Sequence, residues 1–249
     1  MNKLLLGGAV ILFSGLAGTA MAALITWDTD GGAGTTAVKS GSSAGNYYTF
    51  TTGGQALKAH AYATNTTGGS GTFQTATLNL YSGGLGITSQ GESTVSPDHA
   101  IDNNGKNELL VFEFSNSLFD PASFQIGWKD TDSDIRWWIG GASLGANYDF
   151  TGKTFSNLLG LGFTSYSSNN VPINTSTSLI GSDVGRYLIF APALYNTGGS
   201  DRNYDYFKIS QITGQYLIQL PQNPVSEPGT AALLGIALAG LWANRRRKS

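Results

Sequence analysis

The sequence predicts an all-β protein: a single antiparallel β-sandwich of the jelly-roll kind, with an N-terminal signal peptide and a C-terminal apolar helix attached. Three observations lead to this fold class. Apolar and polar residues alternate with period two over many short segments. The chain has 34 glycines among 249 residues, and many of them mark turns between those segments. Charged residues make up only 12% of the chain, too few for a helical bundle or a coiled coil.

The alternating segments define the predicted strands in chain order. They lie at 57–64, 74–81, 110–114, 124–128, 135–139, 185–191, 204–212 and 215–220. Turns are predicted at the glycine or asparagine clusters 53–54, 68–69, 83–84, 103–105 and 198–199. One helix is expected in the body, about a turn and a half at 154–159. Short strands joined by such turns are typical of an antiparallel sandwich.

The charge of the chain is unevenly placed. The formal net charge is −2, but Lys3 and the four basic residues at 245–248 belong to the two ends. The body between the ends keeps 9 basic and 15 acidic residues, a net charge of −6. Nucleic-acid binding needs a basic patch, so this class of partner is excluded. The absence of cysteine excludes disulfides, thiolate metal sites and cysteine nucleophiles.

Residues 1–22 read as a secretory signal peptide. Lys3 supplies the positive start, and residues 4–16 are apolar apart from glycine and serine. Ala20 and Ala22 flank Met21 in a small-x-small cleavage pattern. The apolar run is short for a membrane span of about 20 residues. We therefore expect cleavage after Ala22 and a body that spans residues 23–222.

Residues 223–249 form a tail in three parts. A linker rich in helix breakers at 223–229 precedes an apolar run at 230–243, and a basic cluster follows at 245–248. Such a run is expected to insert into the inner membrane as a helix that the positive charges stop on the cytoplasmic side. Its length is marginal for a span, which favours a transient anchor.

This tail resembles the PEP-CTERM sorting signal of Gram-negative bacteria. In that family a Pro-Glu-Pro motif precedes a short apolar helix and an arginine cluster. The residues that carry the resemblance are Ser226, Glu227, Pro228, Gly229, Arg245, Arg246 and Arg247, with Ser226 in the place of the first proline. The resemblance implies recognition by an exosortase, a membrane cysteine transpeptidase. It also implies delivery to the cell envelope, the cell surface or the extracellular matrix of a biofilm.

Four segments of the body resemble a group of exosortase-dependent surface proteins of about this length. They are residues 96–103 (SPDHAIDN), 126–128 (IGW), 132–135 (DSDI) and 205–208 (DYFK). That group has no established biochemical activity, so the resemblance implies a location and no mechanism.

Two clusters of oxygen-bearing side chains are candidate calcium sites. Asp130, Asp132 and Asp134 alternate along a predicted loop, where their carboxylates could converge on a hard cation. The EF-hand pattern fails, because Ile135 stands where that loop needs glycine. The alternative is a solvated acidic turn. The same two interpretations apply to the cluster Asp98, Asp102, Asn103 and Asn104. Calcium is favoured if the two loops lie at the same end of the sandwich.

Four aromatic residues are candidates for a sugar-binding face: Trp137, Trp138, Tyr204 and Tyr206. Adjacent residues in a strand face opposite ways, so one of the two tryptophans is expected in the core. The other would be exposed or covered by a loop. The alternative for all four is a second apolar layer.

Enzyme motifs are weak in this sequence. Gly-x-Ser-x-Gly occurs at 41–45 and 141–145, but neither serine lies between a predicted strand and a helix, as a nucleophile elbow requires. We therefore expect a non-enzymatic secreted protein, structural or adhesive within exopolysaccharide. The alternative is a carbohydrate-binding module with a defined glycan ligand.

Overall fold

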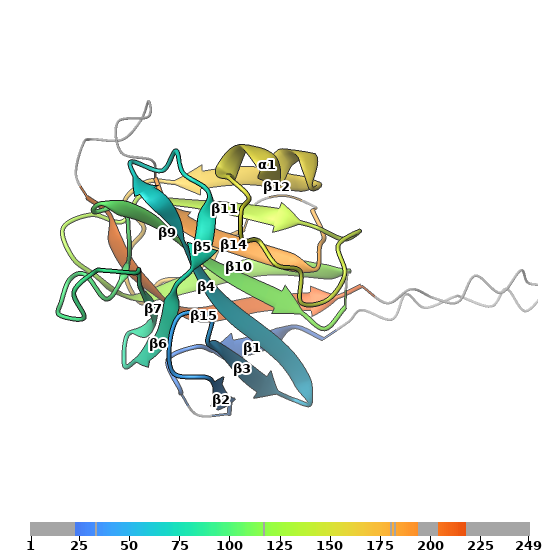
Figure 1. Ribbon diagram of the computed structural model, residues 1–249. Helices are drawn as coiled ribbons and strands as arrows, with labels where there is room; N and C mark the ends of the chain where they lie inside the picture. Colours follow the sequence, from blue (N-terminus) through green and yellow to red (C-terminus); the bar gives the residue numbers. More distant parts are fainter. Residues whose placement is uncertain are drawn as a thin grey trace, which may run out of the picture. The chain divides into compact units, whose positions relative to one another are not determined.

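The computed structural model describes residues 23–32, 34–116, 118–179, 181, 183–193 and 204–217. The predicted signal peptide, the tail and the turn at 198–199 lie outside these residues. The described residues contain fifteen strands and one helix (Figure 1), which in chain order are β1 (Ile25–Asp28), β2 (Thr36–Ser40), β3 (Tyr47–Thr52), β4 (Gln55–Thr67), β5 (Phe73–Thr75), β6 (Thr77–Tyr81), β7 (Gly84–Thr88), β8 (Ile101–Asp102), β9 (Lys106–Phe114), β10 (Phe119–Lys129), β11 (Ile135–Gly140), α1 (Phe155–Gly160), β12 (Phe163–Ser168), β13 (Thr177–Ser178), β14 (Tyr187–Pro192) and β15 (Tyr206–Tyr216).

These strands form two antiparallel sheets that pack face to face. The first sheet has the order β13-β10-β15-β7-β6, with β1 and β8 also paired to β15. The second has the order β12-β11-β14-β9-β4-β3-β2, with β5 paired to β4. The predicted all-β sandwich is confirmed. The described part belongs to one compact unit that ends at Leu217.

The space between the sheets holds the main apolar core. Alternate residues of β4 and β9, such as Leu57 and Phe112, turn inward and are fully buried. From the first sheet, the Phe124 ring packs against Trp137 and Phe190, with ring centroids 5.7 and 4.9 Å apart. Removing a buried aromatic ring of this kind costs about 3–5 kcal/mol. In the absence of cysteine, this burial is the main source of stability.

A second apolar cluster lies on the outer face of the second sheet. Trp138, which points away from the main core, stacks on Phe155 of α1 with ring centroids 5.3 Å apart. Leu158 of the same helix is fully buried there. The helix begins after Thr154, whose backbone N–H donates to the Asn157 side chain at 2.9 Å. The predicted helical turn at 154–159 is thus present, and it covers the second tryptophan.

The sequence placed strand breaks wrongly at two points. The predicted strand 74–81 is broken at Ala76, where the chain passes from the second sheet (β5) to the first (β6). A single continuous strand, β15, covers 206–216 where the sequence predicted two strands at 204–212 and 215–220, and residues 218–220 lie outside the described residues. The partner strands of β15 bridge the expected break, because Gly214 pairs with both Ile25 and Pro121. Period two is the same on either side of such a point, so it does not show where a strand changes partners.

The hairpin between β3 and β4 shows how glycine sets the connections. Gly53 and Gly54 have φ of 55° and 78°, and the flanking residues Thr52 and Gln55 pair directly. Positive φ at both central residues is the type I′ geometry, which matches the twist of the two strands.

Candidate functional site

The four body segments singled out in the sequence meet at one end of the first sheet. β8 pairs with β15 and sets Asp102 opposite Tyr206. On the other side of β15, Trp128 of β10 lies opposite Lys208. The connection between β10 and β11 then brings Asp134 to Asp205, the residue before β15. Asn103 and Asp205, which are 102 residues apart in sequence, are hydrogen-bonded here, so distant segments form one structural junction.

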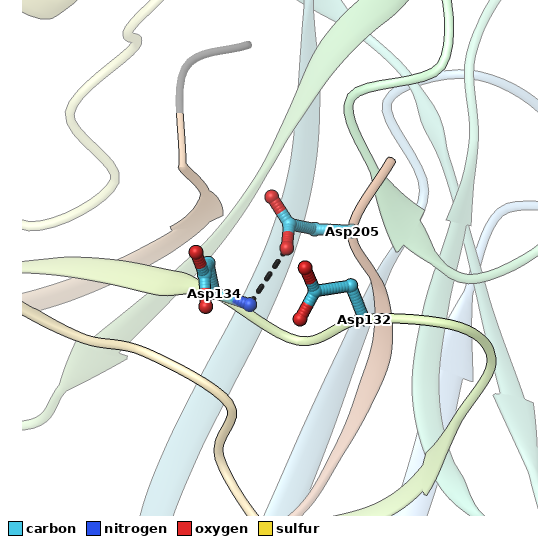
Figure 2. Close-up of side chains that lie close together, drawn as sticks. All are labelled: Asp132, Asp134 and Asp205. Atoms are coloured by element: carbon cyan, nitrogen blue, oxygen red, sulfur yellow. Dashed lines mark hydrogen bonds between the residues drawn. The ribbon is translucent and has the colours of Figure 1, made fainter. Parts of the chain in front are cut away.

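Three aspartates of this junction point toward one another (Figure 2). Asp132, Asp134 and Asp205 each have a carboxylate oxygen within 4.8 Å of the others, and all three are buried. Asp130 is exposed and is not a member of this group. The sequence predicted the triplet Asp130, Asp132 and Asp134. The structure brings together a different triplet, because Asp130 lies at the exposed turn just after β10.

Hydrogen bonds hold this aspartate group in place. Asp205 Oδ1 accepts the backbone N–H of Asp134 at 2.7 Å, and Asp205 Oδ2 accepts the amide of Asn103 at 2.9 Å. Asp134 Oδ1 accepts the backbone N–H of Asn170 at 2.8 Å. Burial, with the nearby charges of Asp134 and Asp132, raises the pKa of Asp205 to about 7. The group offers only oxygen ligands, the type that calcium takes. Calcium at this group stays a prediction.

Asn103 is the side chain that joins the two loops at this end. Its amide donates to Asp205 Oδ2 at 2.9 Å and to the carbonyl of Ala193 at 2.7 Å, and its Oδ1 accepts the Asp205 N–H at 3.0 Å. The loop 103–105 and the loop that carries Asp132 and Asp134 thus lie at the same end of the sandwich. This is the arrangement for which the sequence favoured a calcium site over a solvated acidic turn.

Lys208 occupies an aromatic cage on the outer face of the first sheet. Its Nζ lies 4.4 Å from the ring centroids of both Tyr81 and Trp128, and 3.0 Å from Nε2 of His99. The side chain is 4% exposed, and burial lowers its pKa to about 8. Burial, followed by the charge of Lys208, lowers the pKa of His99. Sequence reasoning missed this cage. The sequence feature that could have found it is a lysine, Lys208, between the apolar residues Phe207 and Ile209 of a predicted strand.

A cleft of about 300 Å³ opens beside the junction. Its lining comes from the segments 89–93 and 104–106 together with Thr67 and Asp98, whose side chains, apart from those of the glycines, are polar. Asp102 and Glu108 are fully buried, and Asp102 Oδ1 accepts the backbone N–H of Asn104, a residue of this lining, at 2.8 Å. Burial and neighbouring carboxylates raise the pKa of Asp102 to about 9 and that of Glu108 well above its usual range.

The predicted sugar-binding aromatic residues are mostly buried. Trp137 and Trp138 are each 3% exposed and Tyr206 is 6% exposed, whereas Tyr204 is 42% exposed. The two tryptophans face the two apolar clusters on opposite sides of β11. A glycan therefore finds no open tryptophan face on this strand, because α1 covers the outward side.

Comparison with known proteins identifies the C-terminal end. Residues 224–248 match the PEP-CTERM protein-sorting motif, so the chain carries this motif as the sequence predicted. The motif implies export, sorting to the cell envelope or surface, and processing by an exosortase. No curated protein and no solved structure matches the chain. Within the part that the structure describes, no helix is long and apolar enough to cross a membrane.

Proposed function

We propose that this chain is a non-enzymatic surface protein of a Gram-negative bacterium with a structural or adhesive role within exopolysaccharide. The observation that carries the proposal is the sorting motif at 224–248, which follows a β-sandwich in the sequence. In this proposal the signal peptide 1–22 is removed on export. The apolar run 230–243 then holds the chain in the inner membrane until exosortase cleaves the tail.

The packing of the body supports a structural role. The largest rings are turned into two apolar clusters. The polar groups of the junction bond mainly to one another. Both histidines also have packing partners: His99 lies against Lys208, and the His60 ring lies 5.4 Å from the Tyr47 ring. A general base needs a substrate proton within hydrogen-bond reach, and these contacts give each imidazole a role in the fold.

The test is affinity electrophoresis of the secreted body, residues 23–222, in gels that contain exopolysaccharide of the producing bacterium. The expected result is retardation relative to a gel without polysaccharide, with no new reducing ends in the polysaccharide. A control protein of similar size and charge should migrate alike in both gels. Unretarded migration, or release of reducing ends, would contradict the proposal.

The alternative, a carbohydrate-binding module with a defined glycan, rests on the exposed ring of Tyr204. Stacking on an exposed ring would make retardation sensitive to Tyr204→Ala and saturable by one oligosaccharide. A structural or adhesive contact spread over the sandwich surface should survive this substitution. The two roles are therefore separable in the same gel.

A further inference from the structure

The outer face of the second sheet carries a guanidinium that two aromatic rings hold in place. Arg136 lies on β11, two residues before Trp138 and on the same face, where Phe155 of α1 packs (Figure 1). The Cζ atom of Arg136 lies 4.7 Å from the centroid of the Trp138 ring and 6.0 Å from that of the Phe155 ring. The two rings also stack on each other. Cation–π contacts with both rings therefore hold the cation in one position.

Arg136 has no ion pair within the described part of the chain. The residue is half-buried, and this burial lowers the pKa of its guanidinium. None of its N–H groups makes a hydrogen bond to a described residue. A guanidinium has five N–H donors and stays charged in proteins. This cation has thus lost part of its hydration without gaining an oxygen partner, a cost that a bound oxyanion would offset.

The other basic side chains differ from Arg136 in this respect. Apart from Lys153, each basic residue of the described part has a hydrogen-bond partner in the protein: Lys39, Lys58, Lys106, Lys129, Arg186 and Lys208. Lys153 lies two residues before Phe155, one of the rings that hold Arg136. The body has a net charge of −6, so most of its surface repels an anion. The start of α1 is where two basic side chains remain available to one.

Hydroxyl groups border the guanidinium on the neighbouring strand. In the register of β11 and β12, Arg136 pairs with Ser167 and Trp138 pairs with Ser165. Directly opposite residues of an antiparallel pair project from the same face of the sheet, so both serines share the face of Arg136. Both serines are exposed. The position therefore combines a planar cation with two open hydroxyls, which suits a ligand that carries an oxyanion and hydroxyls together.

We propose that Arg136 binds a carboxylate of an acidic sugar residue of the exopolysaccharide. Lys153 adds positive charge, and the hydroxyls of Ser165 and Ser167 contact the sugar. The inference rests on the proposed function, for which it names the ligand chemistry. A guanidinium binds a carboxylate through two parallel hydrogen bonds, which an ammonium cannot form. Such a ligand needs no open indole ring, in agreement with the 3% exposure of Trp138.

Affinity electrophoresis of the secreted body, residues 23–222, with defined polymers in the gel tests the ligand class. The polymers are alginate, a polyuronate, dextran, a neutral glucan, and dextran sulfate, a second polyanion. A chelator in the gel prevents calcium from bridging acidic groups. We expect retardation in alginate and none in dextran, and loss of most of the retardation in about 1 M salt, because salt screens exposed charge pairs. Equal retardation in alginate and dextran would overturn the proposal, and so would retardation in dextran sulfate alone.

Variants of Arg136 test the position. Arg136→Lys keeps the charge but lacks the two-point fork, so it should weaken alginate binding at least about fivefold. Arg136→Gln also removes the charge and should weaken binding at least as much. The Tm of each variant reports its folding, and a defect in one leaves the other as the test. Equal retardation of the wild type and Arg136→Gln in alginate would overturn the proposal.

Lys39→Gln is the matched control. Lys39 is an exposed basic residue of β2, in the same sheet, and its Nζ also lies near an aromatic ring, 5.5 Å from the centroid of Tyr48. It already has a hydrogen-bond partner in Asn79. The variant loses the same charge and the same kind of ring contact as Arg136→Gln. It should bind alginate as the wild type does, and a loss as large as that of Arg136→Gln would overturn the proposal.

The inference and the proposed function fail separately. If the native exopolysaccharide retards the wild type and Arg136→Gln equally, the matrix role stands and the role of Arg136 is overturned. If alginate retards the wild type through Arg136 but the native exopolysaccharide does not, the carboxylate site stands and the matrix role fails.

Discussion

Replacing Asn103 by alanine tests whether the junction of the four segments stabilises the fold. Asn103 is 3% exposed and makes three hydrogen bonds, two with Asp205 and one with the carbonyl of Ala193. Alanine removes the side-chain amide and leaves these partners in place. The buried carboxylate oxygen and backbone N–H of Asp205 would then lack their bonds.

The expected cost follows from those orphaned groups. A buried polar group left without a partner costs about 1–3 kcal/mol, and more if it is charged. Two buried groups and one partly buried carbonyl therefore give about 3–5 kcal/mol, since water can reach part of the vacated space. For a body of this size, 1 kcal/mol corresponds to about 2–4 °C in Tm. The variant should melt roughly 10 °C below the wild type.

Thermal unfolding by circular dichroism, with urea unfolding as a second measurement, gives this difference. Asn116→Ala is the control: Asn116 is exposed just after β9, where its Oδ1 accepts the Leu118 N–H. Its expected cost is below about 1 kcal/mol. If Asn103→Ala and Asn116→Ala unfold at the same Tm, the junction does not stabilise the body and the reasoning from its hydrogen bonds fails.

Three other predictions concern separate parts of the chain. Burial lowers the pKa of His60 to about 4 from 6.5, so stability should fall by up to roughly 3 kcal/mol as pH drops from 6.5 to 4, and His60→Gln should remove that slope in urea titrations. Gly84→Ala should cost about 2–4 kcal/mol, because φ is 112° and the new Cβ would strike the β15 backbone, whereas Gly34→Ala meets open space and should cost about 1 kcal/mol. Joint substitution of Glu227 and Pro228 by alanine should leave a precursor in the inner-membrane fraction, because the apolar run then acts as an ordinary stop-transfer anchor.

Each of these predictions has a contrary outcome. An equal pH slope in wild type and His60→Gln would show that burial does not suppress protonation of this histidine. Equal unfolding midpoints for Gly84→Ala and Gly34→Ala would show that the contact with β15 relaxes at no cost. Normal release of the Glu227 and Pro228 variant would show that the apolar run and basic cluster suffice for processing.

Local pattern predicted the elements of the fold well, because each strand shows its own alternation. The strands at 57–64 and 135–139 and the helical turn at 154–159 lie where the sequence placed them. The pattern could not show that Ala76 is a crossing point between sheets or that β15 runs on through Gly214. Both facts depend on which strands pair: β5 and β6 pair with different neighbours, β4 and β7, and β15 pairs with β1 and β10, which lie far away in sequence.

The candidate site was less predictable for the same reason. The sequence offered neighbouring aspartates, and Asp132 and Asp134 do lie together, but their third member is 71 residues beyond Asp134. Glu108 is even harder to find. Glu108 alternates with the inward-facing residues of β9 such as Leu110, so the sequence alone shows only a charged residue at an apolar position. The fold then places it next to Asp102, whose N–H it accepts.

The position of the junction explains why so many polar groups are buried there. Asp205 and Asp102 adjoin or belong to strands of the first sheet, whereas Asp134 leads into β11 and Ala193 follows β14, both in the second sheet. The hydrogen bonds from Asn103 to Ala193 and from Asp134 to Asp205 therefore run between elements of the two sheets, whereas the bond from Asn103 to Asp205 joins two elements of the first sheet. An exported protein with cysteines could link its sheets there by a disulfide. This chain has none, so directional bonds between buried polar groups link the two sheets at that end of the sandwich.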